Sequence, residues 1–206
     1  MSVYKKVKNY LNKYGLLSLL FKGLWKVFSV PAFILHTGRK VVFYFYTKCW
    51  VKNIFGKVHI QGIAGNVRIG KNATIYPGVI LEIGEDAQVR IGDHFTLSYG
   101  ALIACREFVN IGNHVMIGEY TSIRDTTHAF DSNNQEPYMY QPDKMAGIEI
   151  GGNVWVGRGC IILPGTVVEQ GVIIAANSVV KGHLKAYWLY GGTPAKPIRA
   201  LREPLI

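Results

Sequence analysis

An aliphatic side chain returns every six residues over most of this chain, and this spacing excludes most folds. A helix needs apolar returns near 3.6 residues, and an ordinary strand alternates every two residues over one short run. A six-residue period sustained this long indicates a solenoid of short strands, in which three hexapeptides per coil form a triangular prism. The clearest run places the aliphatic residue at Ile150, Val156, Ile162, Val168, Ile174 and Val180.

Small residues and glycine also hold fixed positions in the repeat. We expect the aliphatic residue to point inward, the small residue to fit a tight corner, and Gly or Asn to tolerate the turn geometry. Small or β-branched residues follow four positions after the aliphatic one, at Val154, Cys160, Thr166, Val172 and Ser178. Glycine follows it directly at Gly70, Gly92, Gly112, Gly118, Gly151 and Gly157.

The positive charge of the chain is concentrated near its N-terminus. Residues 1–57 contain eleven Lys and Arg and no Asp or Glu, whereas the remainder contains twelve basic and thirteen acidic residues. We therefore expect residues 58–206 to form the body and residues 1–57 to form a basic, aromatic-rich helical segment. Residues 1–50 are predicted to bind an anionic membrane surface, because lysines attract anionic headgroups and bulky apolar residues enter the acyl boundary. A helical cap packed on the body or on a neighbouring subunit is the alternative.

Several other classes are not expected. The apolar run from Gly15 to Leu35 is interrupted by two lysines and a proline, which makes it a poor membrane span. No cleavage site follows a short apolar core, so a signal peptide is not predicted. No nucleic-acid-reading motif accompanies the basic charge. The three widely spaced cysteines indicate a reduced, cytoplasmic compartment without a disulfide framework.

The motifs "NVWVG" and "ILPG", followed by "YGGTPAKPIR", resemble the hexapeptide-repeat acyltransferases of the left-handed β-helix fold. The closer similarity is to the xenobiotic, galactoside, maltose and polysaccharide O-acetyltransferase branch, and it covers roughly residues 60–202. The resemblance implies a mainly β, left-handed parallel β-helix, a homotrimer, and acetyl-CoA lying in the groove between adjacent prisms. We expect "AKPIRALREPLI" to form a short C-terminal helix that closes the open end of the solenoid.

The repeat breaks around "RDTTHAFDS". Ile123 and Ile150 are 27 residues apart, which is not a multiple of six, so an inserted loop is predicted at about 124–147. The resemblance implies that His128 at its base is the catalytic general base. A sugar hydroxyl is a poor nucleophile until its proton is removed, and neutral imidazole accepts a proton near pH 7. Asp125 and Asp131 are candidates to orient the imidazole, with Asp125 the preferred catalytic partner.

The resemblance also implies three positions near the acceptor and the acyl donor. Ser98 stands where related enzymes use an asparagine to hold the acceptor, and a serine still donates one hydrogen bond. Trp155 lies where the pantetheine arm is expected to pass, and packing at the subunit groove is its alternative role. Arg158 replaces a serine of the relatives, so it could instead reach a phosphate or an acidic sugar.

Three further positions are implied to bind the cofactor. Ala176 matches a site where backbone groups meet the pantetheine arm. Lys181 and Arg199 match positions that grip the adenosine phosphates, although "KGH" stands in place of the usual "TKD". A metal is not expected, because His94 and His114 occupy equivalent turn positions and should stack on one corner of one subunit.

These observations predict an acetyl-CoA-dependent O-acetyltransferase that acts on a sugar hydroxyl of a bacterial surface polysaccharide or its lipid-linked precursor. The enzyme is expected in the cytoplasm, on the inner face of the cell membrane. A soluble galactoside or xenobiotic acetyltransferase would share the catalytic residues without needing the basic segment. A non-enzymatic trimeric β-helix scaffold would share the prism alone.

Overall fold

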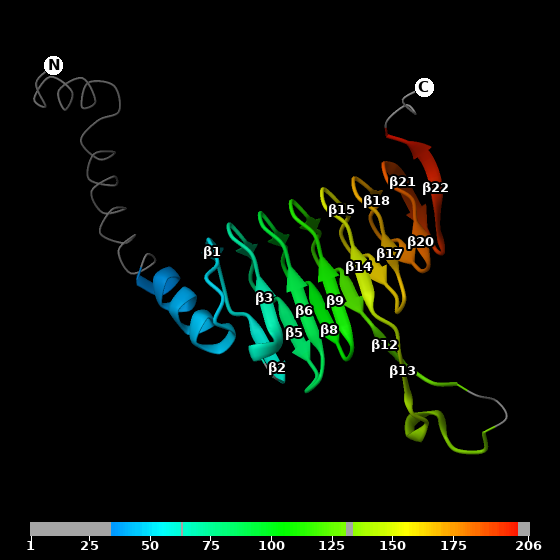
Figure 1. The fold of residues 1–206 in the computed structure, drawn as a ribbon, viewed down its shortest axis with the longest axis horizontal. Coiled ribbons are helices and arrows are strands. Elements are labelled where there is room, and N and C mark those ends of the chain that lie inside the picture. The colour runs from blue at the N-terminus through cyan, green and yellow to red at the C-terminus, as the bar shows by residue number, and fades with distance from the viewer. Residues whose placement is uncertain (1–33, 63, 131–133, 202–206) are drawn as a thin grey trace, which may run out of the picture. The chain divides into compact units, whose positions relative to one another are not determined.

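The computed structural model describes residues 34–62, 64–130 and 134–201, and its strands stack coil upon coil (Figure 1). The chain divides into two compact units, Met1–Gly38 and Arg39–Ile206. A helix covers residues 34–47, and every strand of the described part belongs to the second unit. Most of the segment that we predicted to bind membranes, residues 1–33, lies outside the described residues.

Three parallel sheets form the faces of the prism, and successive coils add one strand to each. Sheet A contains β1 (Asn53–Ile54), β4 (Thr74–Ile75), β7 (Thr96–Leu97), β10 (Met116–Ile117), β15 (Trp155–Val156), β18 (Ile173–Ile174), β21 (Trp188–Gly192) and β22 (Ala195–Ala200). Sheet B contains β2 (His59–Gly62), β5 (Ile80–Ile83), β8 (Leu102–Cys105), β11 (Ser122–Arg124), β16 (Ile161–Ile162) and β19 (Val179–Val180). Sheet C contains β3 (Val67–Ile69), β6 (Gln88–Ile91), β9 (Phe108–Ile111), β14 (Ile148–Ile150), β17 (Val167–Val168) and β20 (His183–Leu184).

The six-residue period corresponds to the core of this prism. The repeat residues from Ile150 to Val180 are all buried, with at most 2% of each side chain exposed. The small residues four positions later, including Thr166 and Ser178, are buried as well. Inward-pointing repeat residues were predicted, and the structure confirms them. The fold is a left-handed parallel β-helix, as the hexapeptide pattern indicated.

Glycine and asparagine serve different purposes at the corners. A Cβ atom on Gly118 would lie 2.5 Å from the Arg158 amide nitrogen, and one on Gly157 would lie 2.6 Å from that of Ala176. Glycine after the repeat residue therefore permits close approach between coils. The left-handed turn conformation belongs instead to asparagine and histidine, including Asn153 and His114 at φ near +60°.

The C-terminal helix that we predicted is wrong for the residues that the structure describes. Residues 195–200 form β22, which pairs antiparallel with β21 at the edge of sheet A. Pro197 lies within this strand, and its missing N–H would remove a bond from a helix interior. An edge strand tolerates a proline, so the strand covers the last coil without that cost. Residues 202–206 lie outside the described residues.

The helix over residues 34–47 has apolar side chains on two faces. Phe43 and Thr47 are buried, and Phe43 joins the core of the solenoid. Val42, Phe45 and Tyr46 point elsewhere and are 56%, 67% and 63% exposed. We call these three residues the exposed helix face. Within the described ranges, no helix combines the length and hydrophobicity needed to cross a membrane.

Candidate functional site

The break in the repeat is an inserted hairpin. Sheet B ends at Arg124 in this coil and sheet C resumes at Ile148, so the insertion leaves the corner between these two faces. Its base is a two-stranded antiparallel sheet of β12 (Thr126–His128) and β13 (Asp143–Met145). A short 3-10 helix, Tyr138–Tyr140, lies within the loop beyond the strands. The hairpin projects from the prism in Figure 1.

His128 lies at the outer end of this two-stranded base. Its backbone pairs with Asp143, and its Nδ1 atom lies 2.8 Å from the Asp143 carboxylate oxygen Oδ1. The imidazole side chain is 75% exposed. A carboxylate on Nδ1 favours the tautomer that carries its proton there, which leaves Nε2 as an acceptor facing solvent. An oriented, accessible imidazole of this kind can remove a proton from a bound hydroxyl group.

Asp125 does not hold the position that we predicted for it. Its side chain is fully buried, and its two carboxylate oxygens each accept a backbone N–H at 2.8 Å, from Arg106 and Glu107. Its Oδ2 atom also accepts the thiol of Cys105 at 3.3 Å. These bonds secure the corner from which the hairpin leaves, so Asp125 is a structural residue. Asp143, which our reading of the sequence missed, takes the role of orienting His128.

Cys105 shows how enclosed this corner is. Burial, together with the charge of Asp125 and its hydrogen bond, raises the pKa of the Cys105 thiol to about 12. The thiol therefore stays protonated near neutral pH and donates to the carboxylate. All three cysteines are buried and free, so each acts as a small packing residue, as their spacing suggested. Asp131, the other predicted orienting residue, lies outside the described residues.

A second feature is a groove of about 570 Å³ along sheet A. It contains four of the predicted site residues, which are Ser98, Trp155, Arg158 and Ala176. Trp155 pairs in register with Met116 on one side and Ile173 on the other, so their side chains form a continuous apolar stripe. Trp155 and Met116 are each 50% exposed. The stripe suits a long, flexible and mainly apolar chain.

The corner beside this stripe supplies polar groups. Ser98, Glu119 and Arg158 lie where the chain turns from sheet A toward sheet B. Arg158 is exposed, and its backbone carbonyl accepts the amide of Asn177 at 2.8 Å. Its guanidinium is therefore available at the rim, while its backbone holds two coils together. The groove as a whole offers an apolar floor and a charged rim.

The two predicted phosphate contacts are separated by the structure. Arg199 pairs with Leu189 across β21 and β22, and Leu189 lines the groove. This places Arg199 beside the end of the apolar stripe. Lys181 directly follows β19 in sheet B, at the corner leading toward sheet C. Lys181 therefore lies on a different corner of the prism from the groove residues.

His128 is also absent from the groove lining. Every lining residue comes from sheet A or the corner after it, and none comes from residues 125–147. His94 and His114 stack as predicted, with ring centroids 4.7 Å apart and planes within 7°. In the part of the chain that the structure describes, no group of three His, Cys, Asp or Glu residues could hold a metal ion.

Comparisons with known proteins agree with this geometry. Residues 147–182 match the family model for "Bacterial transferase hexapeptide (six repeats)". The chain is 31% identical over 142 residues to the putative lipopolysaccharide biosynthesis O-acetyl transferase WbbJ of Escherichia coli K12, covering 66% of this chain and 72% of that protein. It is 28% identical over 138 residues to the galactoside O-acetyltransferase of the same strain, covering 66% of this chain and 64% of that protein.

A solved structure shares the fold. AntD, an N-acyltransferase from Bacillus cereus in complex with dTDP-4-amino-4,6-dideoxyglucose and coenzyme A, superposes with a TM-score of 0.68. It is 24% identical, and the match covers 80% of this chain and 90% of AntD. The periodic core, the hairpin at the break and the identity to WbbJ lead to one conclusion. The chain belongs to the hexapeptide-repeat family of acyltransferases.

Proposed function

We propose that this enzyme transfers an acetyl group from acetyl-CoA to a sugar hydroxyl, with His128 as the general base. The observation that carries the proposal is the 2.8 Å contact between His128 Nδ1 and Asp143 Oδ1, on an imidazole that remains exposed. Nε2 takes the proton of the hydroxyl group as its oxygen attacks the thioester carbonyl. The carbon–sulfur bond then breaks, and the thiolate leaves and regains a proton. The protonated imidazole, stabilised by Asp143, is the nearby source of that proton.

The groove on sheet A is the proposed donor site. Its apolar stripe matches a pantetheine arm in length and character, with Trp155 as the largest contact surface. Arg158 at the rim and Arg199 beside Leu189 are proposed to meet the phosphates, because a guanidinium binds phosphate through paired hydrogen bonds. Ala176 offers backbone groups to the arm, and Ser98 is proposed to contact the acceptor. Lys181, on the other corner, is proposed to reach the phosphates from a neighbouring subunit.

A homotrimer follows from the separation of His128 and the groove. We propose that the hairpin of one subunit extends over the sheet A groove of the next, so that each site combines two chains. Apolar residues on the outer faces of sheets A and B support this arrangement. Met116, Trp155 and Ile161 are each close to half exposed, and burying them between prisms would remove that apolar surface from water.

The proposed acceptor is a surface polysaccharide or its lipid-linked precursor. WbbJ is described as a lipopolysaccharide biosynthesis O-acetyl transferase, and a galactoside enzyme is also similar, so both relatives act on sugars by name. A soluble galactoside or xenobiotic acetyltransferase is the second candidate. It is favoured only if small galactosides are acetylated as well as saccharide chains.

A mixed-subunit experiment tests the shared site. His128→Ala and Trp155→Ala chains should each transfer acetyl slowly, the first through loss of the base and the second through weaker donor binding. When both chains are co-expressed, some interfaces combine an intact His128 with an intact Trp155. We expect thiol release from acetyl-CoA, with a galactoside acceptor, to rise well above either single variant. No recovery in verified mixed trimers would contradict a site built from two subunits. No transfer by the wild-type enzyme to any sugar hydroxyl would contradict the proposed function.

We propose that the enzyme works on the cytoplasmic side of an anionic membrane. The exposed helix face offers Phe45 and Tyr46 to the acyl boundary, and residues 34–57 contain no acidic side chain. Lys40 and Lys48 lie on either side of this face in the sequence. Aromatic insertion plus attraction of lysines to anionic headgroups is the usual basis of interfacial binding. The buried Phe43 shows that the same helix also packs on the prism, so cap and membrane contact coexist in this proposal.

Vesicle binding by the full chain tests this attachment. We expect stronger binding to anionic than to neutral vesicles, with partial release as salt shortens the Debye length from ~10 Å at 0.1 M to ~3 Å at 1 M. Changing Val42, Phe45 and Tyr46 to serine should weaken the salt-resistant part. The matched control changes Tyr138 and Met139 to serine, since these loop residues are 61% and 72% exposed. Equal losses from both variants, or equal binding to both vesicle types, would count against attachment through this face.

A further inference from the structure

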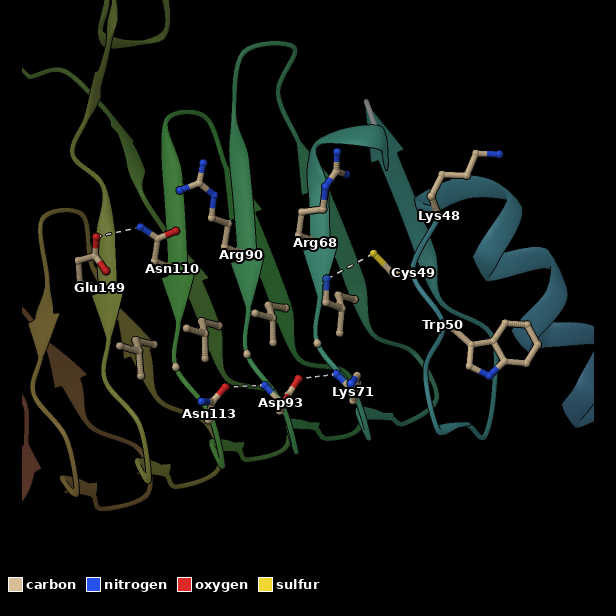
Figure 2. Close-up of a pocket in the computed structure, with 17 residues that line it drawn as sticks. Lys48, Cys49, Trp50, Arg68, Lys71, Arg90, Asp93, Asn110, Asn113 and Glu149 are labelled. Carbon is tan, nitrogen blue, oxygen red and sulfur yellow. Dashed lines mark hydrogen bonds between the residues drawn. The ribbon is translucent and has the colours of Figure 1, made fainter.

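A second groove, of about 950 Å³, crosses the outer face of sheet C over the first coils. Figure 2 shows Arg68, Arg90, Asn110 and Glu149 in a row on successive strands, with Trp50 and Lys48 at one end. None of the lining residues belongs to the hairpin or to the sheet A groove. The acyl-transfer site therefore leaves this groove without a role.

Two arginines in this groove have no charge partner. Arg68 and Arg90 are paired in register on adjacent strands, where like charges repel. Within the described residues, neither guanidinium lies within 4.0 Å of a carboxylate. A neighbouring face shows the contrast, because Arg106 and Arg124 both bind Glu82, at 3.0 and 3.6 Å. The prism thus neutralises one pair of cations and leaves the other pair open.

The acidic residues of the groove are already engaged. Asp93 Oδ1 accepts the backbone amide of Lys71 at 2.6 Å, which links two coils at the corner. Glu149 Oε1 accepts the side-chain amide of Asn110 at 2.9 Å, at the end of the row away from Lys48. The other side-chain atom, Asn110 Oδ1, is turned toward Arg90 in Figure 2 and is a buried acceptor without a partner among the described residues. The polar groups of this groove are therefore not fully satisfied by the protein itself.

The arginines retain donors for a ligand. Arg68 spends Nη1 on the carbonyl oxygens of Gly65 and Val67, and Arg90 spends Nη2 on Gln88 Oε1 at 2.8 Å. A guanidinium has five N–H donors, so each side chain keeps several for an anion. Both side chains are exposed, and their own backbone pairing holds them one strand spacing apart. Carboxylate and phosphate oxygens match this forked geometry.

Trp50 adds a flat apolar surface at the same end. Its side chain is 56% exposed, and the ammonium group of Lys40 lies 5.2 Å from its ring centroid. Tyr44 contacts the indole edge at a centroid distance of 6.0 Å, which supports its orientation. An exposed indole in this setting suits a ligand with one apolar face and a polar rim. A sugar ring presents that combination.

We propose that this groove binds an acidic saccharide, with its carboxylate or phosphate held by Arg68 and Arg90 and a sugar ring packed on Trp50. The site would hold a part of the acceptor chain remote from the hydroxyl that receives the acetyl group. The choice of ligand rests on the proposed transfer to a polysaccharide, whereas the anion site rests on the groove alone.

Direct binding to the full chain, without any acyl donor, tests this proposal. The probe is an oligogalacturonate, and its matched control is a neutral galactan fragment of equal length. Replacing Arg68 and Arg90 together by alanine should weaken oligogalacturonate binding by about tenfold or more, since two charge-assisted contacts are lost. The corresponding double lysine variant should fall between, because it keeps the charge and loses the fork. Trp50→Ala should weaken binding of both saccharides.

Lys57→Ala serves as the matched surface control, since Lys57 is exposed on a different corner and should leave binding unchanged. Unaltered thermal unfolding of the arginine variants would show that they are folded. Equal oligogalacturonate affinity in the wild type and the double alanine variant would overturn the proposal. Tighter binding of inorganic pyrophosphate than of the saccharide would overturn the saccharide part in favour of a bare anion site.

Acetylation of a small neutral galactoside separates this proposal from the proposed function. The arginine variants should acetylate that acceptor at the wild-type rate, because the groove is not part of the transfer site. Failure of wild-type transfer with intact saccharide binding would contradict the function alone. Intact transfer with no arginine-dependent binding would contradict the groove alone.

Discussion

Replacing His128 with alanine is expected to reduce kcat for acetyl transfer by about 10²–10⁴-fold, the usual contribution of a general base. The side chain is 75% exposed and makes its ion-pair contact with Asp143, so its removal should leave the fold intact. Affinity for acetyl-CoA should change little, because no residue of the hairpin lines the donor groove. Steady-state kinetics and equilibrium binding on the purified variant give both quantities.

Asp143→Asn is the companion variant for this measurement. An asparagine can still meet Nδ1, but it does not stabilise the imidazolium that forms when the proton is taken. We expect a smaller fall in kcat than for His128→Ala and no change in stability. A His128→Ala enzyme that keeps more than about a tenth of wild-type turnover would exclude His128 as the base. Full activity of Asp143→Asn would show that another group orients the ring.

Replacing Asp125 with alanine is expected to lower the free energy of unfolding by roughly 2–4 kcal/mol, because two amides lose charge-assisted hydrogen bonds. The acceptors removed are those of Arg106 and Glu107, both bonded at 2.8 Å. The Cys105 thiol loses its carboxylate acceptor as well. Denaturant unfolding followed by circular dichroism would measure the change as a shift in midpoint.

Asp125→Asn is the control for the charge. One amide oxygen can still accept a backbone N–H, so the loss of stability should be smaller than for alanine. The folded fraction of either variant should keep most of its turnover, in contrast to His128→Ala. A stable Asp125→Ala protein with turnover reduced as far as that of His128→Ala would restore Asp125 as a catalytic partner.

Much of the candidate site could be predicted from the chain alone because a solenoid converts sequence distance into spatial distance. When each coil takes a multiple of six residues, side chains at equivalent positions stack on the same face. This is why Trp155, Arg158 and Ala176, read from motifs, line one groove together with Ser98. The same rule predicted the stacking of His94 on His114. It also revealed the inserted hairpin, because 27 residues do not fit the period.

The orienting carboxylate could not be predicted in this way. His128 and Asp143 are fifteen positions apart, and they meet only because β12 and β13 pair antiparallel in one particular register. A loop of unknown conformation offers no period from which to count. Asp125 is nearer in sequence, yet its carboxylate faces into the corner and binds backbone amides. Nearness along a strand does not bring side chains together, because successive residues point to opposite faces.

The six-residue period by itself determined the prism, its buried stacks and the place where the prism is interrupted, because burial of one side chain per strand is a local requirement. Tertiary structure decided what the period does not encode. β22 is a strand and not a helix because the edge of sheet A needs hydrogen-bond partners and Pro197 cannot continue a helix. Arg68 meets Arg90 because early coils take 22 residues, the distance between those two positions, and not three hexapeptides. Such pairings depend on the extra residues at each corner, and only the folded coils set their register.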